Sequence, residues 1–411
     1  MNRYHFRKWA LLLVTLVSTL VMGVRTSMGF FHFLFWFLVA LIVTSLAWVF
    51  VEYFGTRLTL TRQAPGKLRE DDALEIDLRV ENSGILPAFN LVVEDELTFA
   101  AEAERKKRLF IDYLAARAVV RLAYTCRCPL RGKYKIGPLA VYYFDPLGLF
   151  FLKRSFSAEA ELYVYPSTFP IKKLPELVRG TLPWFGIQST RASGDEDEFF
   201  GIREYKEGDP VSRIHWFSTA RKNSLIVKQF QQQNFFRATL LFNLEKDKNF
   251  GEGKDRIAEV IIKIVSSVAG SLLARDVDLE IIASTGQTVH FPFNRGPEHY
   301  EDIQRFLSVA QAESTKTLAE VFEERARFIP SNSTLIVIML DKDWPALSHI
   351  LELTQRDVSV IPVLLVSSTF LFCFDNQEVT RDINIKLLQA GKFKPVLISC
   401  KDNLEEAFNR I

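Results

Sequence analysis

The sequence predicts a multidomain protein with three parts: an N-terminal transmembrane helical hairpin, a β-sandwich and a C-terminal α/β domain. Two long apolar runs at the start predict the hairpin. Short runs in which apolar and charged residues alternate predict the β-sandwich, and apolar strands that alternate with helical patterns predict the α/β domain. The chain has 411 residues, enough for two or three domains at roughly 150 residues each.

The membrane region is predicted to cover residues 1–55. Residues 6–24 and 29–53 are both apolar, and a spanning helix needs about 20 mostly apolar residues. The alternative for the first run, a cleaved signal peptide, lacks a small-x-small cleavage site. Basic residues lie before the hairpin (Arg3, Arg7, Lys8) and after it (Arg57, Arg62, Lys67), with only Arg25 between the runs. The positive-inside rule therefore predicts a multi-pass protein of the bilayer with its C-terminal bulk in the cytoplasm.

The β region is predicted to cover residues 56–168. Residues 74–81 read LEIDLRVE, strictly alternating between apolar and charged, as in a strand with one buried face. Further alternating runs occur at 91–93, 118–126, 134–143 and 161–165, and Pro and Gly separate them. Short strands at this spacing are typical of an antiparallel sandwich.

The α/β region is predicted to cover residues 237–411. Strands are expected at 238–244, 279–283, 288–291, 334–340 and 358–366, and helices at 255–274, 298–309, 318–326 and 345–355. Strands that alternate with helices imply a mainly parallel sheet covered on both faces. Binding sites in such sheets lie at the carboxyl ends of strands, which directs attention to residues 243–247 and 341–343.

Composition and motifs exclude several functions. Lys and Arg number 51 and Asp and Glu number 49, a formal net charge of +2, so we expect no nucleic-acid partner. The sequence has no Gly-x-x-x-x-Gly-Lys-Ser/Thr loop, no His-Glu-x-x-His motif and no nucleophile elbow. It thus offers no motif for an ATPase, a zinc protease or an α/β-hydrolase.

The segment between the β and α/β regions, residues 169–236, contains a run that is both strongly charged and strongly aromatic. Its landmarks are Glu198-Phe199, Arg203-Glu204-Tyr205, Gly208-Asp209, Arg213-Ile214-His215-Trp216, Ala220-Arg221 and Val227-Lys228-Gln229-Phe230. This pattern resembles the signature of the domain of unknown function 58 family. The family often has a lysine after the Trp, where this chain has Phe217.

The resemblance carries expectations about fold, place and partner. Members of the family are bacterial membrane proteins, which implies the bacterial inner (cytoplasmic) membrane. Their C-terminal domain is similar to the von Willebrand factor A fold, a Rossmann-like α/β architecture. Many are encoded beside a MoxR-type AAA+ ATPase, which implies such an ATPase as the protein partner.

The resemblance also implies where a metal would bind. Von Willebrand A domains hold a cation with an Asp-x-Ser-x-Ser loop, a middle Thr and a strand-end Asp. In this chain the corresponding positions are degenerate: Asn243, Glu245 and Asp247 in the loop, Thr317 (or Thr315) in the middle and Asp341 at the strand end. Because a hard cation needs several oxygen ligands, we expect no cofactor, with Mg²⁺ as the less favoured alternative.

Three roles are open for the signature. Arg203, Arg213 and Arg221 interleave with Glu204 and Asp209, which favours a structural ion-pair network that Tyr205, Trp216 and Phe199 would pack against the sheet. A partner-binding surface is the second role. Catalysis is the third role, because His215, Asp209, Glu204 and Ser218 include possible bases and a nucleophile, although spacing alone does not show that they converge.

These observations predict a non-enzymatic, membrane-anchored cytoplasmic binding or assembly factor that works with a MoxR-type AAA+ ATPase in a cell-envelope process. The alternative is a metal-dependent ligand-binding domain, and a hydrolase is a distant third. No catalytic residue is assigned. The segment 169–236 is expected to form a packed junction between the β and α/β domains.

Overall fold

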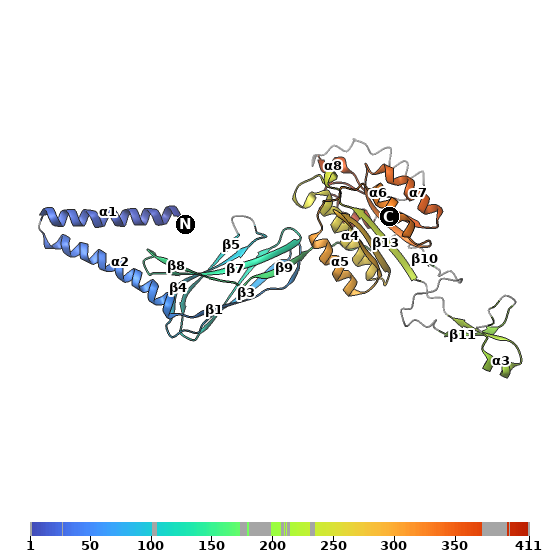
Figure 1. Cartoon of the computed structure of the whole chain (residues 1–411), viewed down its shortest axis with the longest axis horizontal. Coiled ribbons are helices and arrows are strands. Elements are labelled where there is room, and N and C mark those ends of the chain that lie inside the picture. Colours follow the sequence, from blue (N-terminus) through green and yellow to red (C-terminus); the bar gives the residue numbers. More distant parts are fainter. Residues whose placement is uncertain are drawn as a thin grey trace. The chain divides into compact units, whose positions relative to one another are not determined.

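The computed structural model describes residues 2–26, 28–100, 105–172, 179–180, 199–206, 209, 211, 214–230, 235–371, 393 and 395–409 (Figure 1). The chain divides into two compact units. One comprises Met1–Ser167 with Leu307–Val309, and the other comprises Thr168–Phe306 with Ala310–Ile411.

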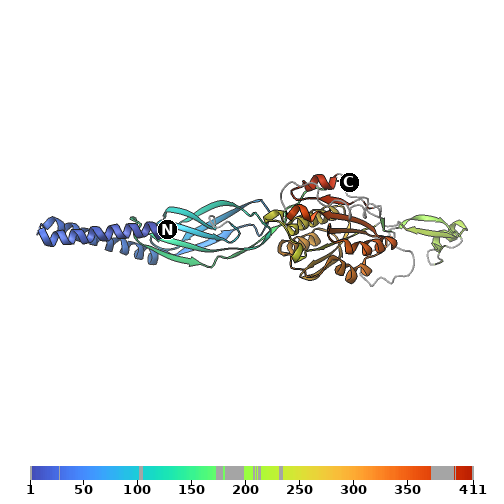
Figure 2. The ribbon, with the colours of Figure 1, turned by 90° about the horizontal axis from the view of Figure 1, so that it is seen from above.

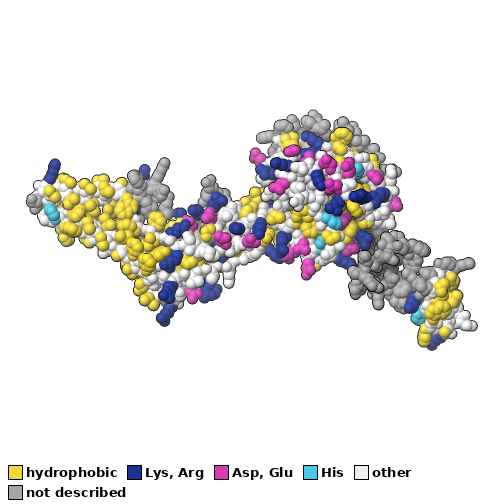
Figure 3. Space-filling view, in the orientation of Figure 1, with side chains coloured by type: hydrophobic (Ala, Val, Ile, Leu, Met, Phe, Trp, Pro, Cys, Tyr) yellow, Lys and Arg dark blue, Asp and Glu magenta, His cyan; other side chains and the backbone are white. Residues whose placement is uncertain are grey.

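The first unit begins with two apolar helices, α1 (Asn2–Thr26) and α2 (Gly29–Gly55). Arg7–Thr26 and Gly29–Gly55 have mean hydropathies of 1.7 and 2.5 and are long enough to cross a membrane. Most of their large side chains are exposed, and yellow side chains cover both helices in Figure 3. The predicted pair of apolar helices is confirmed and supports membrane anchoring, because helices of this length and composition favour hydrocarbon over water.

The described residues of the β domain, in the first unit, form nine strands. They are β1 (Leu58–Gln63), β2 (Lys67–Arg69), β3 (Ala73–Asn82), β4 (Ala88–Leu97), β5 (Lys106–Leu114), β6 (Val119–Arg127), β7 (Gly132–Phe144), β8 (Phe151–Phe156) and β9 (Ala160–Tyr165). One sheet has the order β1-β3-β6. The other has the order β2-β9-β7-β4-β5, with β8 paired to β7. All of these pairings are antiparallel except β2 with β9.

The strict alternation of residues 74–81 appears in β3 as alternating burial: Leu74, Ile76, Leu78 and Val80 are buried and the charged residues between them are not. Apolar residues of both sheets belong to one buried cluster. Within the same region Arg62 and Asp95 form an ion pair of 2.5 Å with side chains 2% and 0% exposed. Tyr124 donates a hydrogen bond of 2.6 Å to Asp95, so this buried carboxylate is fully paired.

The α/β domain of the second unit, which runs from yellow to red in Figure 2, is built on a sheet. The strand order in this sheet is β15-β14-β13-β16-β17-β18. The strands are β13 (Phe235–Asn243), β14 (Asp278–Thr285), β15 (Gln287–Asn294), β16 (Thr334–Leu340), β17 (Ser359–Leu365) and β18 (Val396–Ile398). Of these six, only β15 runs antiparallel to its neighbour. Counted along the domain, the order is 3-2-1-4-5-6, which reverses direction between β13 and β16.

Helices connect these strands. They are α4 (Ile257–Leu273), α5 (Pro297–Val309), α6 (Leu318–Arg325), α7 (Leu347–Gln355), α8 (Ser367–Leu371) and α10 (Leu404–Asn409). Short 3-10 helices supplement them: η2 (Lys246–Lys248), η3 (Gly253–Asp255), η4 (Ala326–Phe328) and η5 (Trp344–Ala346). Strands β13 and β16 are buried along most of their length, because helices shield a parallel sheet on both faces.

The family signature forms a small module of its own. Strand β11 (Phe199–Glu204) pairs antiparallel with β12 (Ile226–Phe230), and helix α3 (Trp216–Lys222) lies between them in sequence. Before this module the short strand β10 (Arg179–Gly180) already pairs with the start of β13. The chain therefore reaches the α/β sheet once before the signature and once after it, and the module is an excursion from that sheet.

Candidate functional site

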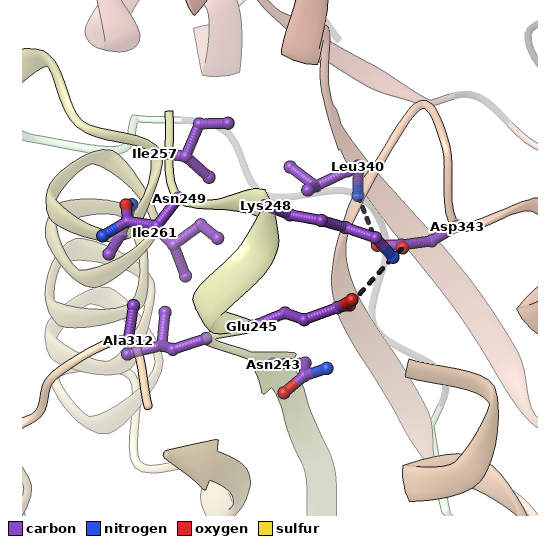
Figure 4. A pocket seen from close by; sticks show the side chains of 11 residues that line it. Asn243, Glu245, Lys248, Asn249, Ile257, Ile261, Ala312, Leu340 and Asp343 are labelled. Carbon is purple, nitrogen blue, oxygen red and sulfur yellow. Dashed lines mark hydrogen bonds and ion pairs between the residues drawn. The ribbon is translucent and has the colours of Figure 1, made fainter. Parts of the chain in front are cut away.

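The crevice of the α/β sheet lies where β13 and β16 end side by side, at the point where strand order reverses. Backbone and side chains at such a point converge from neighbouring loops, which is why open α/β sheets bind ligands there. In this chain β13 ends at Asn243, and Glu245 and Lys248 follow in the η2 turn, while Asp343 follows β16. Residues of these two loops and of α4 line a cavity of about 10 Å³ (Figure 4), which is about the space of one water molecule.

The centre of the crevice is filled by a lysine. Lys248 Nζ lies 2.7 Å from Asp343 Oδ1 and 2.8 Å from Glu245 Oε2. In Figure 4 the end of the Lys248 side chain lies beside Asp343, and a dashed line joins it to Glu245. The Lys248, Glu245 and Asp343 side chains are 23%, 15% and 8% exposed. Burial alone would lower the pKa of Lys248, but the hydrogen bonds to Asp343 and Glu245 outweigh it and leave that pKa raised. The ammonium is therefore charged at neutral pH.

Backbone contacts position both acidic residues. Asp343 Oδ2 accepts a hydrogen bond of 2.9 Å from the Leu340 backbone N–H, so the aspartate closes the turn that ends β16. Glu245 lies in an isolated parallel bridge with Ser314. The turn therefore holds the Asp343 carboxylate in place, and the bridge holds the backbone from which the Glu245 side chain reaches Lys248.

The five degenerate metal-site candidates do not converge. Asn243 lines the cavity and donates from Nδ2 to the Lys316 carbonyl at 2.7 Å. Thr317 caps α6 in a capping box with Glu320. Asp341 accepts a hydrogen bond of 3.0 Å from the Ser367 backbone N–H, and Asp247 is exposed. Of the candidates, only Asn243 and Glu245 line the same cavity.

The side chains present do not fit a divalent cation. A cation such as Mg²⁺ needs a near-octahedral set of oxygen ligands, yet the ammonium of Lys248 takes the position between the two carboxylates. Among the described residues, no group of three or more His, Cys, Asp and Glu side chains is arranged to hold a metal. One acceptor in the crevice, the buried Oδ1 of Asn243, has no hydrogen-bond partner in the described part of the chain.

Lys248 and Asp343 are the two residues that sequence motifs do not reveal. Both lie at or close to the strand ends, residues 243–247 and 341–343, to which the sequence directs attention. A local signal exists for one contact, because Glu245 and Lys248 are three residues apart and can face each other within one helical turn. The contact with Asp343 crosses the sheet and leaves no trace in local spacing.

The signature module contains a well-formed ion pair. Arg203 donates to both oxygens of Asp209 at 2.6 and 2.7 Å, and the Lys206 backbone N–H donates to Asp209 at 2.9 Å. The hydrogen bonds from Arg203 are the largest cause that lowers the pKa of Asp209, to about 2. One predicted pair of the ion-pair network is thus present. Arg213 and Gly208 lie outside the described residues, and Glu204 and Arg221 have exposed side chains.

His215 serves the backbone of the module. It is the N-cap of α3: the Ser218 backbone N–H donates to its Nδ1 at 3.3 Å, and its Nδ1 also lies 2.7 Å from Ser218 Oγ. Asp209 is engaged by Arg203, so the described contacts do not join these groups into a chain from nucleophile to base to carboxylate. The arrangement is that of a capped helix.

The aromatic residues of the module are placed differently from the expectation. Trp216 does not pack against the sheet: it is 64% exposed, and Phe217 beside it is 76% exposed. The cause is the short helix α3, whose first residues project outward because the inward side of the module is taken by Ile214, Ile226 and Val227. Val211, Ile202 and Leu225 are also exposed. Tyr205 is half-buried, and its backbone N–H donates to the Leu225 carbonyl at 2.8 Å.

Comparison with known proteins confirms the resemblance. Residues 201–369 match the family described as "Protein of unknown function DUF58". An uncharacterized protein of Bacillus subtilis (strain 168), YeaD, is 23% identical over 406 residues, which cover 95% of this chain and 97% of that protein.

Several solved structures are similar to about a quarter of the chain. The CARDB domain of a Pyrococcus furiosus protein matches 26% of this chain and 93% of its own at 14% identity, with a TM-score of 0.21. The putative ApaA protein of Bordetella pertussis matches 26% of this chain and 94% of its own at 14% identity, with a TM-score of 0.19.

Proposed function

From a chain whose residues 201–369 match the DUF58 family, we propose a membrane-anchored, non-enzymatic binding or assembly factor that works with a MoxR-type AAA+ ATPase in a cell-envelope process. In this proposal α1 and α2 cross the bacterial inner membrane and the bulk of the chain is cytoplasmic. The β domain is taken as a β-sandwich and the α/β domain as a von Willebrand A-like domain, whose strand order 3-2-1-4-5-6 supports that assignment.

The observation that carries the binding role is the exposed aromatic pair of the signature module. Trp216 and Phe217 are adjacent and largely exposed, and aromatic residues of this kind dominate the energetics of protein interfaces. Polar groups of the same module are engaged with one another: Arg203 with Asp209, and His215 with Ser218. A module whose polar groups serve its own structure while its rings face outward is suited to contact a partner rather than to catalyse a reaction.

The crevice of the α/β sheet supports the same view. A metal-dependent ligand-binding role would require Lys248 to leave both carboxylates, which costs two charge-assisted hydrogen bonds. With Lys248 in place, the crevice keeps a fixed shape without any added ion. The proposed factor therefore binds its partner in a metal-independent manner.

The test is affinity purification of the full chain from gently solubilised bacterial membranes. We expect an AAA+ ATPase of the MoxR type to co-purify, and chelation with EDTA to leave its recovery unchanged. Recovery of the chain without any ATPase would contradict the proposed partner. Recovery that EDTA abolishes would contradict the metal-independent binding.

A matched pair of variants locates the contact. Trp216→Ala with Phe217→Ala removes the exposed rings, and we expect partner recovery to fall about tenfold or more, since aromatic anchors commonly contribute about 2 kcal/mol or more. Phe328→Ala is the control, because Phe328 is 62% exposed on the α/β domain. Equal loss in both variants, or loss in neither, would show that the module is not the contact.

A further inference from the structure

The last turns of α2 are built into the β domain. The Phe89 backbone N–H donates to the Glu52 carboxylate, and Arg154 donates to the Tyr53 carbonyl at 2.5 Å. The Arg154 guanidinium also lies 4.2 Å from the Tyr53 ring centroid. The helix that enters the bilayer is thus held by groups of β4 and β8, and the β domain begins where the apolar helix ends.

The start of α1 reaches the same end of the β domain. The Trp9 ring lies 5.2 Å from the ring of Phe150 in an edge-to-face arrangement, and Lys8 approaches Gly148. Phe150 and Gly148 belong to the turn between β7 and β8. The turns 83–87 and 115–118 lie at this end as well, since Asn82 bonds to the Leu86 and Ala115 carbonyls. We call these three turns and the adjacent strand ends the juxtamembrane end.

Large apolar side chains are exposed at the juxtamembrane end. Ile85 and Leu147 project from two of its turns with 79% and 47% of their surface exposed. On the outer face of the six-stranded sheet, Phe110 is 72% exposed and Phe151 is 42% exposed. The register pairs Val92 with both Phe110 and Tyr142, and Phe144 with Phe151, so these side chains form one patch. Arg108 and four of these residues line a groove of about 100 Å³.

The charges around this patch are mainly positive. Basic side chains at the juxtamembrane end are Arg7, Lys8, Arg57, Arg117 and Lys153. The exposed acidic ones are Asp112 and Glu81, and Glu81 pairs with Arg79 at 3.4 Å. Glu52 and Asp145 also lie at this end, but both are buried and accept backbone hydrogen bonds, from Phe89 and from Leu147 and Phe150. Glu94, farther along the outer face, is bonded by Arg108 at 2.8 Å. Surfaces on which exposed apolar side chains are surrounded by Lys and Arg bind the interface of an anionic bilayer.

We propose that the juxtamembrane end of the β domain is a membrane-binding surface, which inserts Ile85, Leu147 and the outer-face rings among the headgroups of anionic lipid. Continuity with two apolar helices selects lipid as the occupant, because the same joint that fixes α2 brings these side chains to the surface that α2 crosses. This inference rests on the membrane anchoring in the proposed function and adds a second, peripheral contact. Its consequence is that the bilayer surface orients the β domain, in addition to the covalent link to α2.

The test places a benzophenone amino acid at single positions of the full chain in nanodiscs of phosphatidylcholine and phosphatidylglycerol. Leu147 and Phe110 are the test positions. Leu130 is the matched control, because it is a 37% exposed leucine in the turn between β6 and β7, at the opposite end of the strands. Phe37, 53% exposed in the N-terminal half of α2, is the positive control for the span.

After irradiation we expect about tenfold more lipid adduct at Leu147 and Phe110 than at Leu130, the preference that burial of one large apolar side chain gives. We expect phosphatidylglycerol in these adducts at about threefold its share of the bilayer or more. Adducts at Phe37 with none at Leu147 and Phe110 would overturn the membrane-binding surface alone. No adduct at Phe37 would overturn the membrane anchoring on which it rests.

Discussion

Replacement of Lys248 by methionine tests whether a tethered ammonium holds the crevice together. The change keeps the length of the side chain and removes its charge. It leaves Glu245 and Asp343 facing one position with no cation between them. Removing one partner of a fully buried pair costs about 3–5 kcal/mol, and exposed pairs are worth less than about 1 kcal/mol. Since the three side chains are 8% to 23% exposed, we expect a loss of about 2–3 kcal/mol.

The assay is thermal unfolding of the full chain in detergent micelles, followed by near-ultraviolet circular dichroism. For a domain of about 150–250 residues, 1 kcal/mol shifts Tm by about 2–4 °C, so we expect the α/β transition about 5–10 °C lower. The control is Lys246→Met, in the same η2 turn but exposed, which should change Tm by less than about 2 °C.

Divalent cations provide a second measurement on the same variant. Without Lys248 the Glu245 and Asp343 carboxylates face a vacated position, and carboxylate oxygens are ligands of hard cations. Millimolar Mn²⁺ or Mg²⁺ should raise the Tm of Lys248→Met and leave the parent chain unchanged. An equal Tm for Lys248→Met and Lys246→Met, or cation binding by the parent chain, would refute the reasoning.

Three further changes follow from paired groups. Arg62→Met should lower the free energy of unfolding, measured with denaturant, by about 3–5 kcal/mol, because it leaves the buried Asp95 carboxylate without its cation. Arg79→Met, in an exposed ion pair, should lower it by less than about 1 kcal/mol. Thr317→Ala should cost about 1 kcal/mol through the lost cap of α6, and exposed Thr315→Ala serves as its comparison. Arg203→Ala should move the titration of Asp209 from about pH 2 to near its ordinary value of about 4, read by carboxyl-carbon NMR of aspartate-labelled chain. The Asp209 contribution to stability is present above that ordinary value and is lost as pH falls through about 2, and in the variant most of this contribution should be absent at every pH.

Elements with strong periodicity were predictable from sequence. Alternation over 74–81 corresponds to β3 (Ala73–Asn82), and the helical pattern over 255–274 corresponds to α4 (Ile257–Leu273). Strand β4 (Ala88–Leu97) was predictable only at 91–93, because it carries Glu94 and Asp95 as buried charges that break the pattern. Those charges are tolerated through partners distant in sequence, Arg108 and Arg62, which local patterns do not show.

The site shows the same division. The alternation of strands and helices predicted the edge of the sheet at which the site lies, because the carboxyl ends of the strands define that edge. The contact between Lys248 and Asp343 joins residues 95 apart in sequence, and only the adjacency of β13 and β16 brings them together. The exposure of Trp216 could not be predicted from the sequence either, because an aromatic residue in a signature is compatible with a core position and with a surface position.

Because β10 pairs with the first residues of β13, the signature segment could be removed from the gene or exchanged without interrupting the α/β sheet. Gly180 is paired directly with Phe235, so the two ends of the excursion are already neighbours in the sheet. A chain in which a two-residue turn joins these positions would keep the α/β sheet closed and lack the signature altogether. Signature and scaffold can then be inherited, exchanged or lost independently, and a signature grafted from a relative would replace the proposed contact surface without changing the anchor.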